Sequence, residues 1–221
     1  MAHTVHLWGR ISSLNVRKVV WTAQELGITF QRSDAGMAFG INTTPEYLRK
    51  NPNALVPLME DGDFVLWESN VIVRYLCARY GKTQGLYPDD LPERFDAERW
   101  MDWQQTTFNS AGGPAFLHLV RTAPEARKPA LIQASVEKTE PLLSMLNTHL
   151  ANRPYLGGEA FGMADIPMGC ELHRWWGMRS SLFEACGVQR QEIQAFPHVQ
   201  RWFGQLQQRP AALGVLDMAL S

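Results

Sequence analysis

The chain has 221 residues, of which 45% are hydrophobic and 19% are charged. These values are typical of a folded globular protein and exclude a disordered chain. Lys and Arg total 21 against 22 for Asp and Glu, a net charge of -1, so there is no basic field for nucleic acid or an anionic membrane. We therefore expect neither nucleic acid nor a membrane as a partner.

The cysteines, the N-terminus and the hydropathy indicate where the protein works. Cys77, Cys170 and Cys186 are odd in number and far apart, which argues against a disulfide framework and favours a reducing compartment. No basic segment leads into an apolar run at the N-terminus, and no stretch approaches the ~20 apolar residues of a membrane span. The sequence predicts a cytoplasmic protein.

Strand-like and helix-like segments alternate over the first eighty residues. Strands are expected over 4–8 and 28–32, helices over 15–26, 45–50 and 69–80, and a hairpin over 58–60 and 64–67 around Asp61-Gly62-Asp63. Gly27 and Gly81 follow the two longer helices. This order describes one small α/β domain, expected over residues 1–81.

The rest of the chain is strand-poor. Gly85, Pro88 and Pro92 mark a linker over 82–92. Helices are then expected over 93–122, 129–150, 164–176 and 197–208, the first of them interrupted or kinked at Gly112-Gly113-Pro114. We expect an all-α domain over 93–221.

The segment from Arg10 to Asn15 joins the first strand to the first helix. A hydroxyl from Ser12 or Ser13 there would lie beside unpaired backbone N–H groups and the positive end of the helix dipole, which together favour an anion. The alternative is that the serine only caps the helix.

Two residue pairs stand where later elements begin, Val56-Pro57 before a strand and Glu68-Ser69 before a helix. Pro57 fits an ordinary strand edge, but a cis bond would turn the Val56 N–H and C=O outward, where an extended ligand could pair with them. Glu68 fits a surface charge near a helix start. It could also neutralise a ligand ammonium while Ser69 binds the neighbouring carboxylate, and one amino-acid head group carries both charges.

These features together resemble the cytosolic glutathione transferases over nearly the full chain. Val56-Pro57 is similar to that family's cis-proline and Glu68-Ser69 to its γ-glutamyl-binding pair, while 11–17 resembles the catalytic loop of its serine-type members. Residues 161–166 resemble the helix-start signature of the second domain, with Gly162 where that signature has a Ser or Thr N-cap. The resemblance implies a thioredoxin-like α/β domain followed by an all-helical domain.

The resemblance leaves the catalytic residue open among three positions. Counted back from Arg17, the theta and delta patterns place their serine at Ser13, the asparagine-type relatives place their asparagine at Asn15, and the zeta pattern places its serine at Ser12. Neither a tyrosine nor a cysteine stands in this loop. Tyrosine-type catalysis and thiol exchange by a cysteine of the protein are therefore disfavoured.

The implied activity is that of a glutathione transferase in detoxification, with glutathione as co-substrate and a small hydrophobic electrophile. The alternatives are a glutathione-dependent peroxidase or disulfide reductase on the same site, and a non-catalytic transferase-like binding protein. Asn42 is expected at the glycyl end of glutathione. The candidate walls of the electrophile site are Trp8, Arg10, Trp103, Thr107, Phe108, Phe116 and Trp176.

The resemblance also implies a homodimer, in which Asp102, Gln104 and Gln105 are candidates to reach across the interface. No metal is expected. The histidines considered as ligands show no metal-ligand spacing: His118, His149, His173 and His198.

Overall fold

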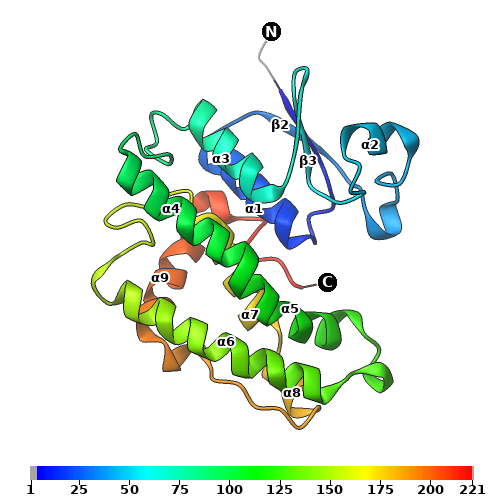
Figure 1. Ribbon diagram of the computed structural model, residues 1–221, viewed down its shortest axis with the longest axis vertical. Helices are drawn as coiled ribbons and strands as arrows, with labels where there is room; N and C mark the ends of the chain where they lie inside the picture. The colour runs from blue at the N-terminus through cyan, green and yellow to red at the C-terminus, as the bar shows by residue number, and fades with distance from the viewer. Residues whose placement is uncertain (1–3, 221) are drawn as a thin grey trace. The chain divides into compact units, whose positions relative to one another are not determined.

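The computed structural model describes residues 4–220, and the chain divides into two compact units, Met1–Arg94 and Phe95–Ser221 (Figure 1). The division falls in the first turn of helix α4 (Leu91–Trp103), just past the linker expected over 82–92. Residues 1–3 and 221, which the expected domains include, lie outside the described residues.

The first unit is built on a four-stranded mixed sheet with the order β2-β1-β3-β4. Its strands are β1 (Val5–Trp8), β2 (Phe30–Ser33), β3 (Leu58–Asp61) and β4 (Phe64–Trp67). β1 runs parallel to β2 and antiparallel to β3, and β3 and β4 form the expected hairpin. The expected α/β domain with a thioredoxin-like fold is confirmed.

Three helices accompany this sheet, namely α1 (Leu14–Glu25), α2 (Pro45–Lys50) and α3 (Ser69–Tyr80). α1 and α3 pack on each other to the left of the strands in Figure 1, and α2 lies to their right. The buried faces of α1 and α3 form the core with the alternate strand residues Val5 and Leu7, which are also buried.

The second unit is helical. Besides most of α4 it contains α5 (Asn109–Phe116), α6 (Pro129–His149), α7 (Asp165–Gly177), α8 (Ser180–Glu184) and α9 (Pro197–Gln207). α5 packs against α6 and α7 (Figure 1), and most of the α7 residues are buried. The expected all-helical second domain is confirmed, although α8 was not anticipated.

Of the two alternatives expected at Gly112-Gly113-Pro114, an interruption is wrong, because these residues lie inside α5, whereas a kink at Pro114 stays a prediction. The helical path from Leu91 to Arg121 instead departs from α geometry in two five-residue π segments, Gln104–Phe108 and Leu117–Arg121. Gly112 serves packing, since a β-carbon there would lie 3.4 Å from Trp175 Cε3 on α7. Gly112 therefore lies at the contact between α5 and α7 and does not end α5.

The start of α7 is organised by Asp165, which is fully buried. Its Oδ1 accepts hydrogen bonds from the Leu156 N–H (2.9 Å) and Trp202 Nε1 (2.8 Å), and its Oδ2 accepts one from the Gly162 N–H (2.8 Å). Burial raises the pKa of Asp165 to about 6, although these hydrogen bonds act in the opposite direction. α7 begins at Asp165 with Ala164 at its N-cap, and the bond from the Gly162 N–H joins this first residue to the expected cap position.

Candidate functional site

The loop before α1 presents Ser13 as the N-cap of that helix. The Ser13 carbonyl accepts from the Arg17 N–H at 3.0 Å, whereas its side chain makes no capping hydrogen bond. Ser13 thus occupies the cap position, as the capping alternative expects, but its hydroxyl makes no capping hydrogen bond. Ser12 lies in the preceding turn, and Asn15 is exposed in the first turn of α1.

A buried cation holds this loop in place. Arg17 is 3% exposed, and its Nε donates to the Ile11 carbonyl at 3.0 Å. Sequence reasoning used Arg17 only to align the loop, because a cation on an amphipathic helix is ordinarily assigned to its solvent face.

The Val56-Pro57 bond is cis, which confirms the sequence prediction. The segment before it is held by side chains that bind its carbonyl groups: Tyr47 Oη and Asn51 Nδ2 donate to the Leu55 carbonyl at 2.6 and 2.9 Å. Burial raises the pKa of Tyr47 to about 12, so its hydroxyl remains a donor at neutral pH. This segment therefore has fixed side-chain anchors immediately before Val56.

Glu68 and Ser69 stand at the start of α3, as expected. Glu68 is its N-cap with a φ of 74°, a left-handed backbone that non-glycine residues seldom adopt. The Ile72 N–H donates to the Glu68 carbonyl at 2.9 Å. The Glu68 side chain is exposed, whereas Ser69 is 2% exposed and is the first residue of the helix.

One small pocket brings most of these residues together. It is lined by Asn15, Asn51, Asn53, Leu55, Val56, Pro57, Trp67, Glu68 and Ser69. The sequence predicted five of these residues. The residues that were missed are Asn51, Asn53, Leu55 and Trp67, which lie within five residues of Val56 or next to Glu68 in the chain. Ser12 and Ser13 are not among the lining residues.

Asn42 has a different partner from the one expected. Its Nδ2 donates to the Ala54 carbonyl at 2.6 Å, so the amide fastens the loop that leads to Val56. Its assignment to the glycyl end of glutathione stays a prediction.

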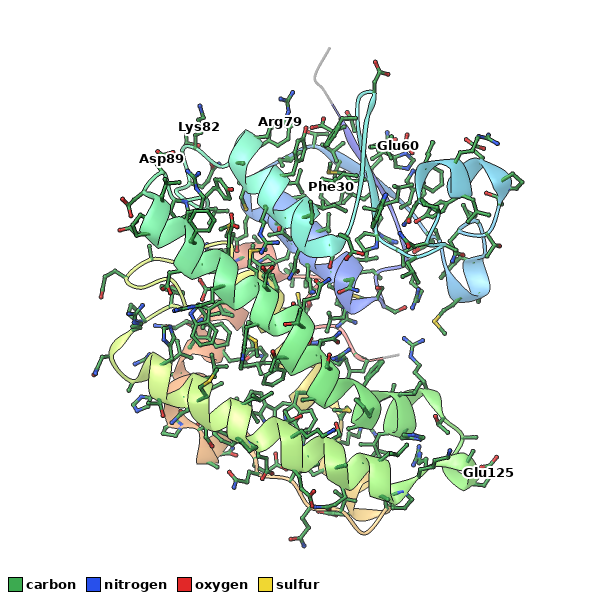
Figure 2. The ribbon with its side chains drawn as sticks, in the orientation of Figure 1. Phe30, Glu60, Arg79, Lys82, Asp89 and Glu125 are labelled. Carbon is green, nitrogen blue, oxygen red and sulfur yellow. The ribbon has the colours of Figure 1, made fainter. Side chains whose placement is uncertain are left out.

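Trp8 lies in another pocket of the first unit. Its Nε1 donates to Glu60 Oε1 at 2.6 Å, and the pocket that it lines includes Tyr47 and Lys50 of α2. Figure 2 labels Glu60 on this side of the sheet, where Lys50 Nζ lies 2.9 Å from Glu60 Oε1. Burial alone would raise the pKa of Glu60, but the hydrogen bonds from Lys50 and Trp8 outweigh it and lower that pKa. These contacts place Trp8 beside α2 and Glu60, and its assignment to the electrophile site stays a prediction.

Arg10 follows Trp8 and Gly9 along the chain and lies against Gly36. A β-carbon at Gly36 would stand 2.9 Å from Arg10 Nη1 and 3.6 Å from Val56 Cγ1. Gly36 has a φ of 86°, so both its backbone and its lack of a side chain suit this position. Arg10 therefore lies near the segment that contains the cis bond.

The candidate electrophile residues of the second unit lie in different surroundings. Trp103 borders a pocket of about 560 Å³ with Arg99, Trp100, Met145, Thr148 and His149. Trp176 packs near Phe196 and Phe203, with ring centroids 6.4 and 6.3 Å away. Phe116 lies beneath the Arg121 and Arg174 guanidinium groups, at 5.5 and 5.3 Å. Thr107 is exposed on the first π segment.

Two predictions in the second unit need correction. Phe108 is fully buried, with its ring 5.7 Å from that of Trp103, so it belongs to the core rather than to an open wall. Gln104 is also fully buried, and its Nε2 donates to Glu171 Oε2 at 2.7 Å. This contact within its own unit removes Gln104 from the residues proposed to reach a partner subunit.

Residues 4–220 contain neither a candidate metal cluster nor a candidate membrane span. No cluster of three or more His, Cys, Asp or Glu side chains suited to a metal ion occurs there. None of the helices in that range has the length and hydropathy to cross a membrane.

Comparison with known proteins identifies the family. Residues 3–78 match the model of the glutathione S-transferase N-terminal domain, and residues 108–210 match that of the C-terminal domain. The chain is 38% identical to glutathione S-transferase GstB of Escherichia coli K12, over 98% of this chain and 100% of that protein. The chain belongs to the glutathione S-transferase family.

Two further proteins are similar to this chain. A theta class glutathione S-transferase from the citrus canker pathogen Xanthomonas axonopodis pv. citri, solved with glutathione bound, superposes with a TM-score of 0.89. The two chains are 40% identical, over 99% of this chain and 100% of that one. Elongation factor 1-gamma 1 of rice is 30% identical over 89% of this chain, which corresponds to 44% of its own length.

Proposed function

We propose that the pocket containing Val56, Pro57, Glu68 and Ser69 binds glutathione, and that the start of α1 stabilises its thiolate for attack on a small hydrophobic electrophile. The observation that carries this proposal is the shared lining, since the cis segment and the start of α3 border the same pocket. The glutathione bound to the Xanthomonas relative supports it.

The pocket offers complementary groups to the γ-glutamyl end of the peptide. The Glu68 carboxylate neutralises the ammonium, while the Ser69 hydroxyl and the N–H groups at the start of α3 bind the adjacent carboxylate. The Val56 backbone pairs with the cysteinyl residue as an added strand would. A ligand bound in this way spans the pocket from Glu68 to Val56.

The thiol requires a lower pKa than it has in water. A free thiol has a pKa near ~8.5, and lowering it by about two units takes ~2.7 kcal/mol of preferential stabilisation of the anion. Ser13 is our first candidate donor, because its hydroxyl is not used to cap α1. Asn15 is the main rival because it lines the pocket, and Ser12 is the third.

Calorimetric titration with glutathione and with S-methylglutathione tests the binding proposal. Both should bind with one site per chain, because the γ-glutamyl and cysteinyl contacts do not involve the sulfur. If neither gives measurable heat or displaces the other, the pocket is not a glutathione site and a non-catalytic role becomes the better account.

A second candidate function is reduction of hydroperoxides or mixed disulfides by glutathione. Asn15 favours it, because this side chain lines the pocket and occupies the position of the asparagine-type relatives. Parallel assays with an aryl halide, a hydroperoxide and a mixed disulfide distinguish the two activities. Turnover of the aryl halide alone supports the transferase.

We also propose that the protein is a cytoplasmic homodimer with a role in detoxification. Asp102, which is exposed, and Gln105, which is half-buried, remain the candidates to reach the partner. Light scattering at micromolar concentration tests the assembly, and a mass of one chain would contradict it.

A further inference from the structure

Lys18 is an unusual residue for the interior of the first unit. It lies on α1 with 1% exposure, among the largest fully buried side chains. Lysine is almost never fully buried without polar partners, because desolvating an ammonium is costly. We therefore expect the buried Lys18 ammonium to contact polar groups.

The ammonium is directed at the start of α3. Lys18 Nζ lies 3.2 Å from Asn70 Oδ1 and 3.5 Å from Ser69 Oγ. The first distance is an ordinary hydrogen bond and the second is a long one, at which the charge still attracts the serine oxygen. Asn70 is 3% exposed, so these groups form a buried polar layer under the pocket that Ser69 lines.

This contact determines which way the Ser69 hydroxyl can point. A lysine ammonium carries only donors, so Ser69 Oγ is the acceptor toward Lys18. The Ser69 hydroxyl hydrogen is consequently turned away from Lys18 and can be donated to a ligand atom in the pocket. A carboxylate accepts such a hydrogen bond, whereas a ligand ammonium cannot.

The charges also give the pocket a polarity. Lys18 lies behind Ser69, and the adjacent residue Glu68 carries the opposite charge at the exposed surface. A ligand head group with one ammonium and one carboxylate is therefore bound in one orientation, with its carboxylate on the Ser69 side.

We propose that Lys18 is a positioning residue for the γ-glutamyl carboxylate of glutathione, acting through the Ser69 hydroxyl from beneath the pocket. This inference rests on the proposed function, and it assigns a role in ligand orientation to a side chain that does not line the site.

The test compares three ligands by calorimetry. Glutathione carries both carboxylates, γ-aminobutyryl-cysteinylglycine lacks the γ-glutamyl carboxylate, and glutathione glycine ethyl ester lacks the glycyl charge. Each is titrated into the wild-type protein, Lys18→Met and Lys18→Gln, after circular dichroism has shown that the variants are folded. If Lys18→Met does not fold, the same comparison with Lys18→Gln decides.

Lys18→Met should weaken glutathione and its ethyl ester about tenfold or more, as expected for loss of a charge-assisted contact. It should change the affinity for γ-aminobutyryl-cysteinylglycine by less than about twofold, because that ligand has no carboxylate for Ser69 to bind. The affinity of Lys18→Gln for glutathione should lie between those of the wild type and Lys18→Met, because glutamine keeps a hydrogen-bond donor but not the charge.

Thr22→Ala is the matched structural control, because Thr22 is fully buried on the same helix and its Oγ1 donates to the Lys18 carbonyl at 2.8 Å. It should affect all three ligands equally. Equal losses for all three ligands in Lys18→Met would overturn the positioning role while leaving glutathione binding intact. Failure of the wild-type protein to bind glutathione would instead overturn the proposed function.

Discussion

Gly9 and Val16 lie so close together that a β-carbon at position 9 would stand 2.4 Å from Val16 Cγ2. The same β-carbon would be 3.1 Å from Val56 Cβ, and Gly9 has a φ of 147° that side chains rarely adopt. Gly9 therefore lets the end of β1, the first turn of α1 and the segment with the cis bond meet at one point.

Gly9→Ala should lower the free energy of unfolding by about 2 kcal/mol or more, because it adds a steric clash to a backbone strain of ~1–3 kcal/mol. Urea unfolding followed by tryptophan fluorescence measures the change. The same variant should weaken glutathione binding, since relief of the clash moves Val16 or Val56.

Gly113→Ala is the control for this substitution. Gly113 lies in α5, and a β-carbon there meets nothing within 4 Å. In a helix this change should be neutral or stabilising by up to ~1 kcal/mol. If Gly9→Ala were as stable as Gly113→Ala, the close approach at Gly9 would not matter to the fold.

Glu68→Ala and Ser69→Ala should each weaken glutathione binding about tenfold or more while leaving the fold intact. Truncating one partner of a charge-assisted contact typically costs ~2–5 kcal/mol when the contact is desolvated, and the exposed Glu68 should give the smaller loss. Calorimetry provides the affinities, and Ser144→Ala, on the exposed face of α6, is the matched control. Parent-like binding by both pocket variants would refute the proposed anchor.

Asp165 should make the stability of the protein depend on pH. Its folded-state pKa of about 6 is raised above the ordinary value of 3.8. A carboxyl with a raised pKa contributes stability that is fully present below the unfolded-state pKa and is lost as the pH rises through about 6. A difference of about two pKa units corresponds to about 3 kcal/mol.

The comparison for this prediction is between wild type and Asp165→Asn, which cannot ionise. Denaturant unfolding between pH 4 and 7 should show the stability advantage of the wild type shrinking as the pH rises. An advantage that grows over this range would mean that the three hydrogen bonds to Asp165 lower its pKa instead.

Local signals in the sequence predicted some elements to the residue. α2 begins at Pro45 because the Thr44 side chain caps it by accepting from the Tyr47 N–H at 3.3 Å, and proline suits the first helical position. α3 likewise occupies the predicted range. Caps and prolines act over a few residues, so such boundaries can be read without knowledge of the fold.

Side-chain direction was predicted less well. Val5 and Leu7 face the core, so the alternation of a strand places Trp8 on the opposite face, which the aromatic content alone did not reveal. The burial of Lys18 and Gln104 depends on partners more than fifty residues away, Asn70 and Glu171. Pattern rules assign such polar residues to solvent, so tertiary contacts of this kind were missed.

The central claim is that bound glutathione is held as a thiolate by the start of α1. The pKa of the bound thiol is measured from thiolate absorbance at the ultraviolet edge as the pH is varied. The proteins compared are the wild type, Ser13→Ala, Asn15→Ala and Ser12→Ala. The wild type should titrate about two units below the free thiol's ~8.5, and Ser13→Ala should move that value up by about one to two units with little change in affinity. If only Asn15→Ala raises the pKa of the bound thiol, Asn15 rather than Ser13 stabilises the thiolate, as in the asparagine-type relatives. A wild-type titration near that of free glutathione would contradict the account.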